Sequence, residues 1–256
     1  VTQAPLTVSP VAKTVTYGEA APTFTFAVNG WVNSQTASTA ASYVAPTCSA
    51  SSYTRTTAVG TSVSITCSGG SATNYSFVYQ TAALTIQTRG TLTITASSPS
   101  AINYGAATPA NNYSTSGLAA NDVISGLTYT YAGSGSTTYA ASTTAPTMPG
   151  TYSITPSAVT FSTGATSNYT TVAYVAGSFT INSATLTITA NSPSAIEYGG
   201  STPSNGYSTT GLSSTDTITG LTYTYEGTGS TNYAASTTAP TKAGTYSITP
   251  SAVTFS

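Results

Sequence analysis

The chain repeats itself with a period of 94 residues, and this period limits what it can fold into. Leu92 opens a Leu-Thr-Ile-Thr-Ala run that returns at Leu186, and Ser162 returns as Ser256 (186 − 92 = 94; 256 − 162 = 94). No gap is needed between the two copies. Periods of about 20–50 residues indicate solenoids or propellers, whereas this one is close to the roughly 100 residues of an immunoglobulin-like β-sandwich. Each copy is therefore expected to be a whole domain.

A more distant copy precedes these two. It opens with Leu6-Thr7-Val8-Ser9 and contains a Tyr-Gly pair at 17–18, as the later copies do at 104–105 and 198–199. We predict repeat 1 at residues 5–88, repeat 2 at 89–182 and repeat 3 at 183–256, with residues 1–4 as the tail of a preceding copy. Repeat 3 lacks a counterpart of residues 163–182, its C-terminal strands. Either the sequence is an excerpt of a longer protein, or a strand from another chain completes the repeat by strand addition.

The residue pattern is typical of β-strands throughout. Leu127, Tyr129 and Tyr131 alternate with threonines, which gives the period of two of a half-buried strand. Turn signals such as Pro149-Gly150 separate such runs, and no capped helical pattern appears. The predicted fold class is all-β, with tandem immunoglobulin-like β-sandwich domains. Because the linkers are only four or five residues long, we expect an elongated rod of roughly 30–40 Å per domain.

The low charge of the chain excludes several functions. Only 4% of residues are charged, against about 25% in ordinary soluble proteins. Four scattered basic residues cannot form the basic surface that nucleic-acid binding needs. No apolar stretch approaches the roughly 18 residues of a membrane span, so no membrane insertion is expected. A net charge of −1 favours self-association into fibres or a surface carrying glycans.

The sequence offers no recognisable catalytic, cofactor-binding or metal site. It contains no histidine, the commonest general base and metal ligand. Repeat 2 has Asp122 as its single acid, so paired-carboxylate chemistry has no pair there, and a calcium site would need six to eight oxygens with several carboxylates. We therefore predict that the chain is not an enzyme and carries no cofactor.

Some polar and aromatic residues leave two interpretations open. Asp122 and Asp216 occupy the same repeat position, either as a ligand contact or as loop carboxylates that accept backbone N–H bonds; we expect the second. The 19 tyrosines are either core and cross-strand partners, which their recurrence favours, or a carbohydrate-binding surface. Trp31 is either a core anchor of repeat 1 or an exposed contact.

Cys48 and Cys67 are the only cysteines. Two soft ligands without histidine make a poor zinc site, so a Cys48–Cys67 disulfide is predicted. A disulfide implies an oxidising, extracellular setting, at the cell surface or secreted.

Several motifs recur in the same order and suggest a family. They are the Leu-Thr-Ile openings, the Tyr-Gly pairs, the run at 150–155 and the closing segment 168–181. In these motifs the chain resembles the MBG-type ("mostly beta, glycine-rich") repeats of large bacterial surface and secreted proteins, and repeat 1 resembles the variant with two cysteines. The resemblance implies an immunoglobulin-like fold, a place in adhesin-like or matrix proteins, and no established catalytic residues.

Three functional hypotheses follow. The first is a structural stalk or fibre of a bacterial surface protein that holds an adhesive or other tip away from the cell. The second is a self-assembling subunit of an extracellular filament or sheath, completed by strand donation. The third is a carbohydrate-binding module.

Overall fold

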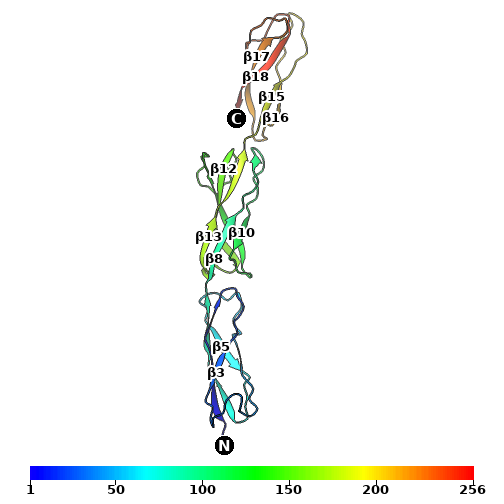
Figure 1. Ribbon diagram of the computed structural model, residues 1–256. Helices are drawn as coiled ribbons and strands as arrows, with labels where there is room; N and C mark the ends of the chain where they lie inside the picture. Colours follow the sequence, from blue (N-terminus) through cyan, green and yellow to red (C-terminus); the bar gives the residue numbers. More distant parts are fainter.

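The computed structural model describes all 256 residues and is all-β apart from one short 3-10 turn, η1, at Thr166–Asn168. Figure 1 shows three β units that follow one another from the N-terminal end of the chain. The first two units each contain two small sheets whose strands contact each other, in agreement with the predicted β-sandwich. No helix in the structure has the length and hydrophobicity needed to cross a bilayer.

Repeat 1 consists of a three-stranded and a four-stranded sheet. The first has the order β3-β1-β6, with β1 at Ala4–Pro10, β3 at Phe26–Asn29 and β6 at Tyr75–Tyr79. The second has the order β2-β7-β5-β4, with β2 at Lys13–Thr16, β7 at Ala82–Gln87, β5 at Val63–Ser68 and β4 at Thr47–Ser49. The β1–β6 and β2–β7 pairs are parallel, so the first strands of the repeat lie beside its last ones.

Repeat 2 has the same strand order, and two of its strands are much longer than their counterparts. One sheet has the order β10-β8-β13, with β8 at Arg89–Ala96, β10 at Tyr113–Ser116 and β13 at Tyr169–Val175. The other has the order β11-β12-β14-β9, with β11 at Val123–Gly133, β12 at Gly150–Thr163, β14 at Gly177–Asn182 and β9 at Ile102–Asn103. The β8–β13 and β14–β9 pairs are again parallel.

Repeat 3 contains only two strand pairs. Strand β15 (Thr187–Ala190) pairs with β16 (Tyr207–Thr210), and β17 (Ile218–Gly227) pairs with β18 (Tyr246–Phe255). The counterparts of β15 and β18 in repeat 2, β8 and β12, each have a second neighbour, β13 or β14. Among the hydrophobic residues of repeat 3 only Tyr225 is buried.

The alternating pattern seen in the sequence decides which side chains form the cores. In β8, Leu92 and Ile94 are buried while Thr93 between them is only partly buried on the opposite face. Burial of such aliphatic side chains stabilises the fold by about 1.5–3 kcal/mol each. Hydroxyl-bearing threonines and serines fill the outward positions, so the surface is polar although charges are scarce.

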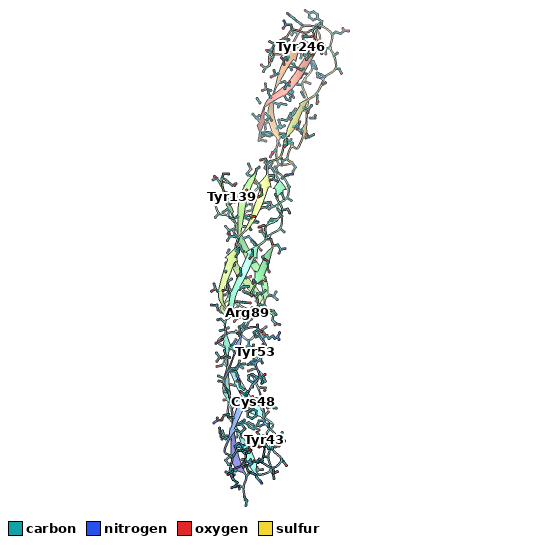
Figure 2. All side chains as sticks on the ribbon, viewed as in Figure 1. Tyr43, Cys48, Tyr53, Arg89, Tyr139 and Tyr246 are labelled. Atoms are coloured by element: carbon teal, nitrogen blue, oxygen red, sulfur yellow. A yellow bond between two sulfur atoms is a disulfide. The ribbon has the colours of Figure 1, made fainter.

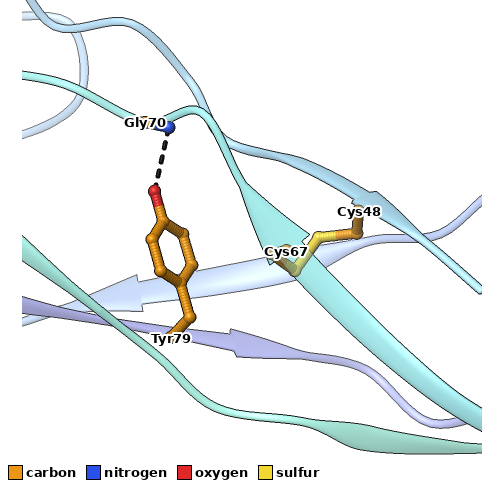
Figure 3. The surroundings of a disulfide bond; sticks show 4 residues. All are labelled: Cys48, Cys67, Gly70 and Tyr79. Atoms are coloured by element: carbon orange, nitrogen blue, oxygen red, sulfur yellow. Dashed lines mark hydrogen bonds between the residues drawn. A yellow bond between two sulfur atoms is a disulfide. The ribbon is translucent and has the colours of Figure 1, made fainter.

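The predicted disulfide is present in repeat 1. Cys48 of β4 and Cys67 of β5 face each other in an antiparallel pair and their sulfurs are bonded. Figure 3 shows the bond, and nearby the backbone N–H of Gly70 donates a hydrogen bond to the hydroxyl of Tyr79. The bridge ties the edge strand β4 to the sheet.

Candidate functional site: the joints between repeats

The joint between repeats 1 and 2 contains a buried aspartate and a salt bridge. At its centre lies Asp122, whose exposed fraction is 6%. Its Oδ1 accepts a hydrogen bond from the hydroxyl of Tyr17 in repeat 1 at 2.6 Å, and its Oδ2 accepts one from Tyr169 in repeat 2 at 2.6 Å. The expectation that this carboxylate would accept backbone N–H bonds was wrong, because tyrosines from both sides of the joint supply the donors. Short O–H···O⁻ bonds of this kind are roughly twice as strong as neutral ones.

The Tyr-Gly pair of repeat 1 is placed by the end of a strand. Strand β2 ends at Thr16, and the N–H of Glu19 donates to the carbonyl of Thr16 at 3.1 Å, which closes a turn around the pair. Gly18 has φ +86°, which favours glycine, and a Cβ added there would lie 2.9 Å from the Cβ of Ala119. The two loops therefore touch where Gly18 has no side chain.

Repeat 2 also contributes to the apolar core of repeat 1. Ala119 is 1% exposed and packs in the cluster formed by Val15, Tyr17, Leu84 and other residues of repeat 1. The backbone N–H of Val59 donates to Oδ1 of Asn168, a buried residue of repeat 2, at 3.2 Å. The joint is therefore a packed interface.

An arginine reinforces the outside of this joint. Nη1 of Arg89 lies 3.0 Å from Oε1 of Glu19 and donates to the carbonyl of Tyr17 at 3.3 Å, while its Nε donates to the carbonyl of Gly117 at 3.0 Å. Figure 2 shows Arg89 at the boundary between the first two repeats. A partly exposed ion pair is worth only about 0.2–1 kcal/mol, so the Arg89–Glu19 pair by itself adds little to the joint.

The surroundings of the two tyrosines at Asp122 keep both hydroxyls protonated. Burial, together with the neighbouring carboxylate, raises the pKa of Tyr17 well above its ordinary value. The same causes raise the pKa of Tyr169 to about 12, although its bond from the backbone N–H of Ala119 acts in the opposite direction. Both hydroxyls therefore stay hydrogen-bond donors at neutral pH.

The joint between repeats 2 and 3 has the same central contact. The hydroxyl of Tyr104 donates to Oδ1 of Asp216 at 2.8 Å. The adjacent Gly105, with φ +83°, lies directly against Ser213, which corresponds to Ala119. The two joints thus pair a Tyr-Gly turn with a loop that carries a small residue and, three positions later, an aspartate.

This second joint is the looser of the two. The positions of Glu19 and Arg89 are taken by Ala106 and Ser183, which cannot form an ion pair. A cavity of about 320 Å³ opens beside Tyr104 and Asp216, lined also by Ile102, Pro146 and Ile181.

Comparison with protein families agrees with this repeat architecture. The MBG domain (YGX type) family matches residues 6–85, 92–180 and 186–256. The chain belongs to the MBG domain family. A search of curated proteins gives no match. The Tyr-Gly pair present in all three MBG repeats of this chain is the part that makes contact across both joints.

The first MBG repeat carries a variant of the aspartate loop. Gln35 stands where the later repeats have Asp122 and Asp216, and its Oε1 accepts a hydrogen bond from Tyr75 at 2.7 Å, as Asp122 does from Tyr169. All three loops are closed by the same kind of hydrogen bond: the N–H of Gln35 donates to the carbonyl of Val32 at 3.1 Å, as the N–H of each aspartate donates to the third residue before it. The backbone between differs, because Asn33 and Ser34 have φ of +55° and +58°, whereas the corresponding residues of the later repeats have no positive φ. However, Val32 replaces the small Ala119 and Ser213.

The aromatic residues range from buried through partly buried to exposed. Most of the largest rings lie in cores or between strands, with Tyr17, Tyr152 and Phe179 almost fully buried. Trp31 is partly buried, and its ring lies edge-on to the rings of Tyr43 and Tyr75, so it is an anchor that still reaches the surface. Tyr198, by contrast, is 81% exposed.

Sequence reasoning noticed the Tyr-Gly pairs and the two aspartates but did not connect them. The signal that could have connected them is that they occur together. Repeats 2 and 3 each contain the aspartate, and each comes directly after a repeat that contains a Tyr-Gly pair. No group of three or more His, Cys, Asp or Glu residues that could hold a metal occurs in the structure.

Proposed function

We propose that the chain is a structural segment of an extracellular bacterial surface protein, in which MBG repeats form a stalk that holds another part of the protein away from the cell. The observation that supports this proposal is that a tyrosine–aspartate hydrogen bond connects neighbouring repeats at both joints. Such a contact limits how one repeat can rotate relative to the next. At the first joint this contact is buried and accompanied by packing of Ala119 into the preceding core. Repeats joined in this way add their lengths and resist bending at the joints. A stalk needs both properties.

Other features support an extracellular location and a structural, non-catalytic role. The disulfide is stable in an oxidising environment, and the hydroxyl-rich surface offers very few lysines and arginines to proteases. We accordingly propose that the chain is not an enzyme. Antibodies against the chain should label intact cells of the source organism or its secreted material; labelling only after cell permeabilisation would contradict the proposed location.

Small-angle X-ray scattering of the full chain tests the stalk. Strands of 11 and 14 residues span the second repeat, which at about 3.4 Å per residue gives roughly 40 Å per repeat and about 120 Å for three repeats. A thin rod of that length has a radius of gyration of about 35 Å, whereas a compact chain of 256 residues would give about 18 Å. A measured value close to 18 Å would refute the stalk.

A further inference from the structure

The exposed Tyr198-Gly199 turn of repeat 3 has the conformation of the two turns that form joints. Gly18, Gly105 and Gly199 have φ of +86°, +83° and +87°. The turns are closed by the same hydrogen bond: the N–H of Gly200 donates to the carbonyl of Glu197 at 2.9 Å, as Ala106 donates to Asn103 at 3.0 Å. The Tyr198 turn is thus preformed, while nothing lies within 4 Å of a Cβ added at Gly199.

The loops that receive such turns have a recognisable composition. Both have a small residue, Ala119 or Ser213, against the glycine, and an aspartate three positions later that accepts the tyrosine hydroxyl. A larger side chain at the first position would occupy the space next to the glycine. A charged acceptor makes the hydrogen bond stronger than a neutral amide does, because bonds to ionised groups are worth about 1.5–3 kcal/mol against about 1 kcal/mol for neutral ones.

We propose that the Tyr198-Gly199 turn is a docking surface for the loop of a further MBG repeat, one that has a small residue followed three positions later by aspartate. The hydroxyl of Tyr198 donates to that aspartate, and Gly199 lies against the small residue. Both aspartate loops of this chain are already occupied, by Tyr17 and Tyr104. The variant loop of repeat 1, with Val32 and Gln35, is not an equal partner, since it lacks both the space and the charge.

The position of Tyr198 also depends on the strands that follow it in a complete repeat. In repeat 2, β9 pairs with β14 and the N–H of Tyr104 donates to the carbonyl of Asn182 at 2.8 Å, which anchors the turn. Repeat 3 contains no counterpart of β14 beside Ile196, which is 51% exposed. A further repeat joined through such strands would bring both the anchor and the aspartate loop to Tyr198.

The first experiment uses the existing chain and measures nitration of individual tyrosines by tetranitromethane, mapped by peptide mass spectrometry. Tyr198 gives the rate of an exposed tyrosine and Tyr17 that of a buried one. The double variant Ser213→Val with Asp216→Gln gives the second joint the loop residues of repeat 1. Nitration of Tyr104 should then rise toward the rate of Tyr198 while that of Tyr17 stays unchanged. A Tyr104 rate equal to that of the unmodified chain would overturn the pairing rule.

The second experiment extends the chain by one period, with a copy of residues 163–256 placed after Ser256, which corresponds to Ser162. This adds the missing strands and a loop that copies Ser213 and Asp216. Nitration of Tyr198 should fall to the rate of Tyr104, and replacing the added aspartate by alanine should restore it. Equal nitration of Tyr198 in the original and extended chains would refute the docking proposal.

The alanine variant also controls for folding, because it keeps the added strands and removes only the acceptor. If Tyr198 stays protected in that variant, the strands alone cover it and the proposed contact is wrong. The inference deepens the stalk proposal and rests on repeats being joined in series. The two fail separately: a compact chain in scattering refutes the stalk, and an unprotected Tyr198 refutes the docking surface.

Discussion

Replacing Tyr17 by phenylalanine should loosen the first joint and lower the stability of repeat 1. The change keeps the ring, which is 1% exposed, and removes only the hydroxyl that donates to Asp122. Asp122 then retains one donor, Tyr169. Losing a hydrogen bond to a charged group costs about 1.5–3 kcal/mol, which is roughly a 10- to 150-fold change in the unfolding equilibrium.

Trp31 provides the assay, because it is the only tryptophan and lies in repeat 1. Its fluorescence therefore follows the unfolding of that repeat in urea even though the chain as a whole need not unfold in one step. With an m value of about 1.5 kcal/mol/M, the midpoint of the Trp31 transition should fall by about 1–2 M.

Tyr104→Phe is the matched control for this measurement. It removes the corresponding hydroxyl at the second joint, away from repeat 1, so the Trp31 transition should stay where it is. The reasoning would be refuted if Tyr17→Phe left the transition within about 0.5 kcal/mol of the original chain, a typical margin for surface substitutions, or if Tyr104→Phe shifted it equally.

Three further predictions test other contacts. Gly105→Ala should raise the nitration rate of Tyr104, because a Cβ at position 105 meets Ser213. Gly199→Ala introduces similar backbone strain at a turn without a neighbour and should leave the Tyr104 rate unchanged, so equal effects of the two variants would contradict the contact. Alkaline pH should weaken the first joint, because burial and the Asp122 carboxylate raise the pKa of Tyr17 and Tyr169 on folding: their contribution is complete below about pH 10 and is lost at higher pH, for Tyr169 as the pH rises through about 12. In Asp122→Ala, absorbance at 295 nm should show these two tyrosines titrating at lower pH than in the original chain, and an unchanged titration would argue against a contribution of the carboxylate. Replacing both cysteines by alanine should lower the stability of repeat 1 by roughly 3 kcal/mol, seen as an earlier Trp31 transition, and an unchanged transition would show that the bridge does not constrain the unfolded chain.

Much of the architecture followed from the sequence because its cause is local. Alternation of apolar and hydroxyl-bearing residues decides which face of a strand is buried, so the inward face of β11, with Leu127 and Tyr129 partly buried and Tyr131 buried, could be recognised before any contact was known. The disulfide was predictable because only one pair of cysteines exists. The period of 94 residues likewise indicated whole domains in series.

Only the tertiary structure decided what the Tyr-Gly pair and the aspartates do. Tyr17 and Asp122 are 105 positions apart and belong to different repeats, so no local pattern connects them. Their contact depends on where the turn after β2 ends and on how closely Gly18 lets Ala119 approach. The sequence of each repeat by itself determined a β-sandwich with a hydroxyl-rich surface. Which loops meet between repeats, and through which atoms, depends on the spatial placement of two separately folded units, because a hydrogen bond forms only where donor and acceptor come within about 3 Å.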